Sequence, residues 1–208
     1  MARTTAPFMS MDASGTLGKT LTASRWKGRS YMRLRVIPAN PKTAMQVAFR
    51  AMMKFLGQTW SGLTDMDKVT WNNQAGANNY SPFNAFVSTN QKRWGSFLSP
   101  SQQSPADLTG TAATLATPVG VGGVRMATVT IATTAAADGW GLYVYRTPGG
   151  APAGTQDEVI AVLEMDGTST VFVDSPLEPG AYQYKVRGFA KSGKQGALTA
   201  SSGAVTVT

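Results

Sequence analysis

The side chains best suited to chemistry in this sequence are the basic and aromatic ones gathered between residues 25 and 35. Five Lys or Arg residues surround Trp26 and Tyr31 there, and no acidic residue interrupts them. Guanidinium groups bind carboxylates and phosphates through paired hydrogen bonds, and aromatic rings add contact area or stack on bases. The stretch therefore predicts a surface that binds an acidic protein, nucleic acid or an acidic membrane. The predicted docking residues are Arg25, Trp26, Lys27, Arg29, Tyr31, Met32, Arg33, Leu34 and Arg35.

Residue types that support catalysis are scarce. The chain has no cysteine and no histidine, which excludes thiolate nucleophiles, cysteine-ligated metals and the commonest general base. Asp65 and Asp67 stand where a helix should begin, so we interpret them as caps rather than metal ligands. The acids at 157–158 and 164–166 are expected to be solvated turn residues. We therefore predict no catalytic residue, no cofactor and no metal site, and we do not expect an enzyme.

Charge is distributed unevenly along the 208 residues. The chain carries a net charge of +8, but residues 1–100 contribute +10 and residues 101–208 contribute −2. The two halves are therefore expected to face different surroundings.

No apolar run approaches the roughly 20 residues that a membrane-spanning helix needs, and the first residues lack the apolar core of a signal peptide. We expect a protein made in the cytoplasm, without a membrane partner.

The elements that must position the basic stretch are an extended hairpin and three helices. A hairpin is predicted over residues 15–37, turning at Lys27-Gly28. Alternation places Tyr31, Arg33 and Arg35 on one face of its second strand and Met32, Leu34 and Val36 on the other. Helical spacing and capping signals predict helices over about 41–56, 65–76 and 82–95. Residues 1–98 are thus expected to form a basic docking domain.

The C-terminal half is predicted to be all β. Residues 99–117 lack periodicity and are rich in Ser, Thr, Ala and Pro, which favours a linker. Short β-prone runs separated by Gly, Pro and Asp clusters follow over 118–208, as in an antiparallel β-sandwich. The expected fold class is therefore α+β multidomain: an extended arm with a small three-helix unit, then a sandwich.

Over 118–208 the sequence resembles a fibronectin type III domain. The turn LEPG runs into AYQYKVRGF, so that Leu177, Pro179, Gly180, Tyr182, Tyr184 and Val186 match the family pattern. The resemblance implies that the Tyr182 hydroxyl bonds back to the preceding turn. The family's tryptophan would fall near Ala132, whereas this chain has Trp140 on the next strand. Such a likeness concerns fold more than chemistry.

Over about residues 15–91 the sequence looks like small virion proteins of tailed bacteriophages. The ordered pieces are GKTLTASRWKGRSYMR, PANPKTAMQ, LTDMDKVTWNNQA and SPFNAFVSTN. The resemblance implies a non-enzymatic structural protein located in the virion. Its N-terminal part would dock onto the capsid, neck or tail, and its sandwich would be displayed outward. The expected partners are other virion proteins and further copies of this chain.

Two other functions remain open. Gly57, Trp60, Lys68, Trp71 and Ala75 are spaced similarly to residues in the second and third helices of a high-mobility-group box, which bends DNA. That likeness implies an architectural DNA-binding protein, although Gly76 and Pro82 interrupt the long basic third helix that the family needs. A surface or glycan-adhesion module is the other alternative.

Overall fold

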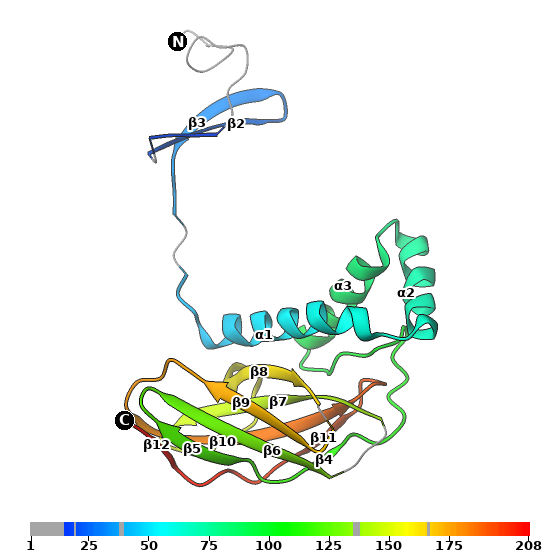
Figure 1. The fold of residues 1–208 in the computed structure, drawn as a ribbon. Helices are drawn as coiled ribbons and strands as arrows, with labels where there is room; N and C mark the ends of the chain where they lie inside the picture. Colours follow the sequence, from blue (N-terminus) through cyan, green and yellow to red (C-terminus); the bar gives the residue numbers. More distant parts are fainter. Residues whose placement is uncertain (1–14, 19, 38–39, 135–137, 166) are drawn as a thin grey trace. The chain divides into compact units, whose positions relative to one another are not determined.

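The computed structural model describes residues 15–18, 20–37, 40–134, 138–165 and 167–208, which Figure 1 draws in colour. The chain divides into two compact units, residues 1–41 and residues 42–208. We call the first unit the arm and the second the body. The division lies well before the linker that the sequence predicts at 99–117, so the helices belong with the sandwich rather than with the basic hairpin.

The arm is a three-stranded antiparallel sheet. Its strands are β1 (Gly15–Leu17), β2 (Leu21–Trp26) and β3 (Arg29–Leu34), in the order β1-β2-β3. Lys27 and Gly28 form a two-residue turn in which both residues have positive φ, 48° and 79°. This is the turn whose twist suits a hairpin, and the predicted turn position is confirmed. Strand β1 was not expected from the sequence, because three residues are too few to show a period.

The body begins with three helices, α1 (Ala44–Thr59), α2 (Asp65–Asn78) and α3 (Pro82–Gly95). Ser81 caps α3 and Thr64 caps α2, in each case by accepting a backbone N–H three residues on, as their sequence signals predict. Helix α1 starts later than predicted because Lys42 has φ +49°, outside the helical region. It also continues through Gly57, and the short 3-10 turn Trp60–Gly62 follows it.

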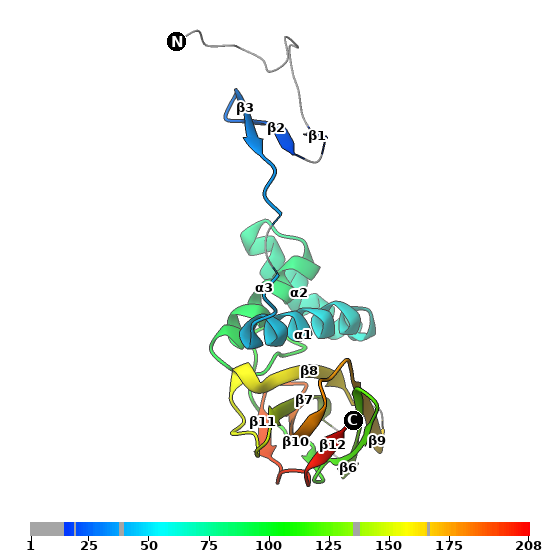
Figure 2. The same cartoon turned by 90° about the vertical axis from the view of Figure 1, so that its left-hand side faces the viewer.

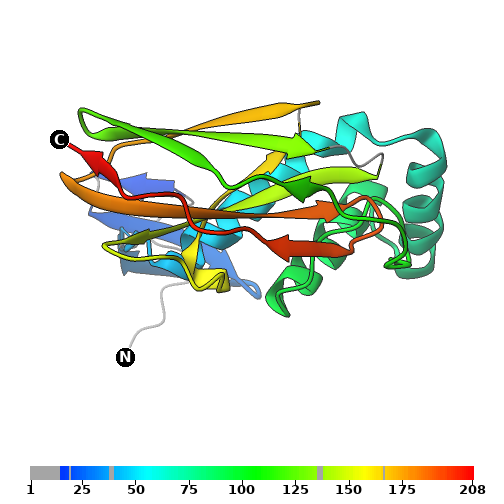
Figure 3. The ribbon, with the colours of Figure 1, turned by 90° about the horizontal axis from the view of Figure 1, so that it is seen from below.

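Two antiparallel sheets follow the helices. The larger has the order β11-β10-β7-β8, with β12 also paired to β10, and the smaller has β6 between β5 and β9, with β4 at one end of β6. Figure 3 shows the long β10 (orange) beside β11 and β12 (red). The bounds are β4 Thr114–Leu115, β5 Val119–Gly123, β6 Met126–Thr134, β7 Gly139–Pro148, β8 Val159–Glu164, β9 Ser169–Asp174, β10 Gly180–Ala190, β11 Gln195–Leu198 and β12 Val205–Val207.

Alternation along the strands builds the first of two cores. Leu142 and Val144 of β7 lie between the two sheets with Val129, Tyr184 and Val186, all fully buried. Because successive side chains of a strand point to opposite faces, the neighbouring residues of β7 must point away from this core. Figure 2 shows what lies on that side, the helical layer above the larger sheet.

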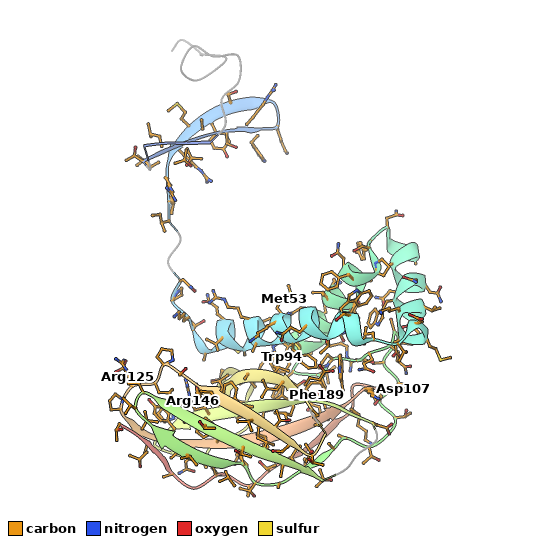
Figure 4. All side chains as sticks on the ribbon, in the orientation of Figure 1. Met53, Trp94, Asp107, Arg125, Arg146 and Phe189 are labelled. Atoms are coloured by element: carbon orange, nitrogen blue, oxygen red, sulfur yellow. The ribbon has the colours of Figure 1, made fainter. Side chains whose placement is uncertain are left out.

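The second core joins the helices to the outer face of the larger sheet. Tyr143 and Phe189 of the sheet pack against Phe55 of α1 and Trp94 of α3, and each is at most 1% exposed. Figure 4 shows Trp94 and Phe189 between the two layers, whereas Met53 lies on the other side of α1. The expected separate three-helix unit is therefore wrong: these helices share their core with the sandwich.

Residues 99–117 are packed rather than a free linker. Ser101 is buried, and its backbone N–H and C=O both bond to the Asn90 side chain, at 2.8 and 3.0 Å. The Trp71 Nε1–H donates to the Gln102 carbonyl at 2.6 Å, and Ser99 accepts a 2.8 Å bond from the Tyr143 hydroxyl. A stretch of small polar residues forms a free linker when its backbone groups hydrogen-bond to water. Here side chains of the helices form hydrogen bonds with those backbone groups instead.

The observed fold is α+β, with two antiparallel sheets stacked as a sandwich and a helical layer on the larger one. Along the described part of the chain, no helix is both long enough and apolar enough to cross a membrane.

Candidate docking surfaces

The strand register of the arm separates its side chains into two chemically different faces. Across β2 and β3, Thr22 pairs with Arg33, Ser24 with Tyr31 and Trp26 with Arg29. The intervening pairs are Leu21 with Leu34, Ala23 with Met32 and Arg25 with Ser30. Since paired residues share a face, one face carries basic and aromatic groups and the other is mainly apolar. The predicted alternation along residues 29–34 is confirmed.

The basic-aromatic face presents Trp26, Arg29, Tyr31 and Arg33. Trp26 is 65% exposed, and the Lys27 ammonium lies over its ring at 4.9 Å from the centroid. Guanidinium groups beside aromatic rings form a surface for carboxylates or phosphates. Arg35 follows the strand, and its backbone N–H donates to the Thr20 carbonyl at 2.7 Å, which extends the pairing by one bond.

The apolar face consists of Leu21, Ala23, Met32 and Leu34, with Arg25 at its end. Leu34 is 73% exposed and Met32 39% exposed. All nine predicted docking residues are exposed, as a docking role requires. A small sheet with both faces open gains little from burial in water, so a partner surface would stabilise it.

A second exposed surface lies on the smaller sheet and was missed by the sequence reasoning. Val119, Val121, Val171 and Val173 are 51–66% exposed, and register places them in two rows on either side of Thr130 and Thr128. No charged side chain stands in these rows. We call this surface the valine face. The signal was present in VGVGG at 119–123. Gly120 and Gly122 alternate with the exposed valines and face inward, where a side chain on Gly122 would collide with the Thr206 backbone.

The acidic residues serve structural roles. The Asp67 backbone N–H donates to the Thr64 hydroxyl at 3.2 Å, as expected of a helix cap, and Asp65 lies in the first turn of the same helix. Burial alone would raise the pKa of Glu158, but backbone N–H donors of Ala153, Thr155 and Gly154 hold it below its usual value. Of the residues that the structure describes, no group of three His, Cys, Asp or Glu could hold a metal ion.

The buried tyrosines are not poised for acid–base chemistry. Burial raises the pKa of the Tyr143 and Tyr145 hydroxyls far above their ordinary range, so both stay neutral at physiological pH. Burial, with the nearby Asp174 carboxylate, raises the pKa of Tyr184 as well. That carboxylate also accepts two bonds from Arg146, at 2.8 and 2.9 Å, which links the edge strand β9 to β7.

Comparison with known proteins gives limited likeness. No protein-family model matches the chain, and no curated protein matches it. Among solved structures, a β-1,2-glucanase from Parabacteroides distasonis aligns over 47% of this chain and 13% of its own, with 16% identity and a TM-score of 0.34. A superoxide reductase (neelaredoxin) from Ignicoccus hospitalis aligns over 45% of this chain and 82% of its own, with 12% identity and a TM-score of 0.31. The PKD domain of an M14-like peptidase from a Thermoplasmatales archaeon aligns over 48% of this chain and 98% of its own, with 14% identity and a TM-score of 0.28.

Proposed function

We propose that this chain is a non-enzymatic structural protein of a bacteriophage virion, whose arm docks onto the capsid, neck or tail and whose body is displayed outward. The observation that carries the proposal is the arm. Residues 1–41 hold seven basic residues and one acid, a net charge of +6, whereas residues 42–208 have a net charge of only +2. Most of the net positive charge thus lies in the first 41 residues, whose sheet also exposes Leu34 and Met32.

The two faces of the arm suit attachment to a protein lattice. Burying Leu34 and Met32 against a partner would contribute about 1.5–3 kcal/mol for each fully buried side chain. On the opposite face, Arg29 and Arg33 can form bidentate hydrogen bonds with partner carboxylates, which fixes the geometry of docking. Binding is then the whole mechanism, and no chemical step is required.

Nucleic-acid binding is the second candidate, because the basic-aromatic face favours it specifically. Trp26 and Tyr31 on this face could stack on bases while Arg29 and Arg33 contact phosphates. Nucleic-acid binding would leave the apolar face of the arm without a contact. Its Leu34, 73% exposed, is the reason that we favour protein docking.

The body fits a fibronectin type III-like display module. The Tyr182 hydroxyl donates to the Glu178 carbonyl at 2.9 Å, four residues upstream, which is the bond that the resemblance to this family implies. The guanidinium of Arg146 also lies over the Tyr182 ring, 5.6 Å from its centroid. The two sheets and this bond support the assignment.

Replacing Tyr182 with phenylalanine tests this corner bond. We expect the free energy of unfolding of the full chain to fall by about 0.5–1.5 kcal/mol, because one hydrogen bond is lost while the ring packing stays. Chemical denaturation measures the change. Tyr80→Phe, at a half-exposed tyrosine on the helical layer, is the control and should change nothing. Equal stability of the Tyr182→Phe variant and the parent would show that the bond contributes nothing.

Self-association is part of the proposal, and the valine face supports it. Its two rows carry four valines that are 51–66% exposed, and contiguous exposed apolar patches often mark association surfaces. Two such faces can stack as sheets do in a sandwich, without charged groups to desolvate.

Removing the arm tests the proposed function. A chain that begins at residue 42 should fold, because both cores are built from residues 48–207 and no described residue of the arm belongs to either. It should nevertheless be lost from phage particles purified from cells that produce it, whereas the full chain should be found in the particles by mass spectrometry. Absence of the full chain from every particle fraction would contradict the virion assignment.

A further inference from the structure

A groove of about 320 Å³ runs between helix α1 and the edge of strand β8. Residues from three elements of the body line it. They are Lys42, Val47, Arg50, Ala51 and Lys54 from α1 and the segment before it, Ile160, Ala161, Val162 and Leu163 from β8, and Phe172 from β9.

The groove follows the open edge of the strand. In the described sheet, β8 is the last strand and has β7 as its one strand neighbour. Val162 belongs to the core beneath the helices, whereas Ala161 packs between the two sheets. Both faces of β8 therefore line the groove, so it must run along the edge that separates them. Such an edge presents backbone N–H and C=O groups to an incoming strand.

The groove is basic above an apolar floor. Arg50 and Lys54 lie one turn apart on α1, and Lys42 stands just before the helix. Among the residues that the structure describes, no acidic side chain lines this groove, although Asp157 and Glu158 line the neighbouring hollow beyond Lys42. The ammonium groups of Lys42 and Lys54 favour a ligand with several carboxylates, and Val47 and Phe172 favour apolar side chains between them.

We propose that this groove binds an extended acidic segment of a partner polypeptide, which adds to β8 as a further strand. Backbone hydrogen bonds to the strand edge would give affinity, as in other cases of strand addition. Alternate side chains would divide between the two environments, carboxylates toward Lys42 and Lys54 and apolar groups toward Phe172. The basic arm has the wrong charge for this site. The proposal concerns the body alone and does not rest on the function proposed for the arm.

The test uses the full chain and synthetic eight-residue peptides. A labelled peptide of alternating Glu and Val is titrated with the protein by fluorescence anisotropy, beside a Lys-Val peptide and an N-methylated Glu-Val peptide that cannot pair as a strand. We expect binding of the Glu-Val peptide, with at least tenfold weaker binding of the other two. Amide shifts on binding should fall within Val159–Glu164 and α1.

Charge-reversal variants locate the site. Lys54→Glu combined with Lys42→Glu should weaken Glu-Val binding about tenfold or more, since two favourable charge contacts become unfavourable. Lys194→Glu together with Lys191→Glu, in an exposed turn of the body outside the groove, is the matched control and should change affinity less than twofold. No Glu-Val binding, equal binding of the N-methylated peptide, or amide shifts confined to the arm would each overturn the proposal. A virion role could fail while this site stands, because the assay contains no particle.

Discussion

Replacing Phe55 with alanine is expected to destabilise the whole body by about 3–5 kcal/mol. Phe55 is 1% exposed and comes from helix α1, yet its ring contacts Trp140 at 4.9 Å and Phe189 at 5.5 Å between centroids, both on the larger sheet. Truncation leaves a cavity between the layers and removes edge-on aromatic contacts. Because the core is shared, helices and sandwich should unfold in one transition at a lower denaturant concentration.

Far-ultraviolet circular dichroism and tryptophan fluorescence, followed through the same denaturant series, measure this effect. Met53→Ala is the matched control, because Met53 is 51% exposed on the same helix and its loss should cost less than about 0.5 kcal/mol. If the helical signal melted first and left a stable sandwich, the two layers would be separate domains after all.

The strands and two of the helices could be predicted from the sequence because their signals are local. The β-prone runs MATVTIAT, GLYVYRT and AYQYKVRGF coincide with β6, β7 and β10, and the Ser81-Pro82 cap marks the start of α3. The start of α1 could not be predicted in this way. The capping signal at Asn40-Pro41 predicts a helix that begins at residue 41. The helix begins at Ala44 instead, because Lys42 has a positive φ.

The packing of the helices on the larger sheet could not be predicted from the sequence, because it depends on contacts between segments that are distant in the chain. Strand β7 reads GWGLYVYRTP and is apolar at both alternating positions, which indicates burial on both faces. That pattern requires a further layer above the sheet, and the aromatic helices are the part of the chain available to provide it. Composition favoured a linker at 99–117, but Asn90 and Trp71 hold its backbone from helices elsewhere in the sequence.

The two faces of the arm hairpin were predictable from the sequence, and the groove was not. Arg33 and Leu34 are neighbours in sequence, so strand periodicity alone assigns them to opposite faces. The groove joins Lys54 to Val162 and Phe172, which are more than a hundred residues away along the chain. A single sequence carries no local pattern for such a site.

We propose that the arm binds protein through its apolar face, and variants on the two faces of the arm test this proposal. Leu34→Asp should reduce incorporation of the full chain into purified phage particles at least tenfold, because it places a charge within the proposed buried contact. The double variant Arg29→Lys with Arg33→Lys should also be impaired, since lysine cannot reproduce bidentate bonds to carboxylates. Thermal melting of the body should be unchanged in both variants, because its cores lie within residues 42–208.

The measurement is the amount of each variant per purified particle, taken together with the affinity of the free protein for duplex DNA across a salt series. We expect loss of Leu34→Asp from the particles and weak DNA binding at physiological salt. Tight duplex binding at that salt, falling steeply as salt is raised, together with normal incorporation of Leu34→Asp, would contradict protein docking and assign the arm to nucleic acid.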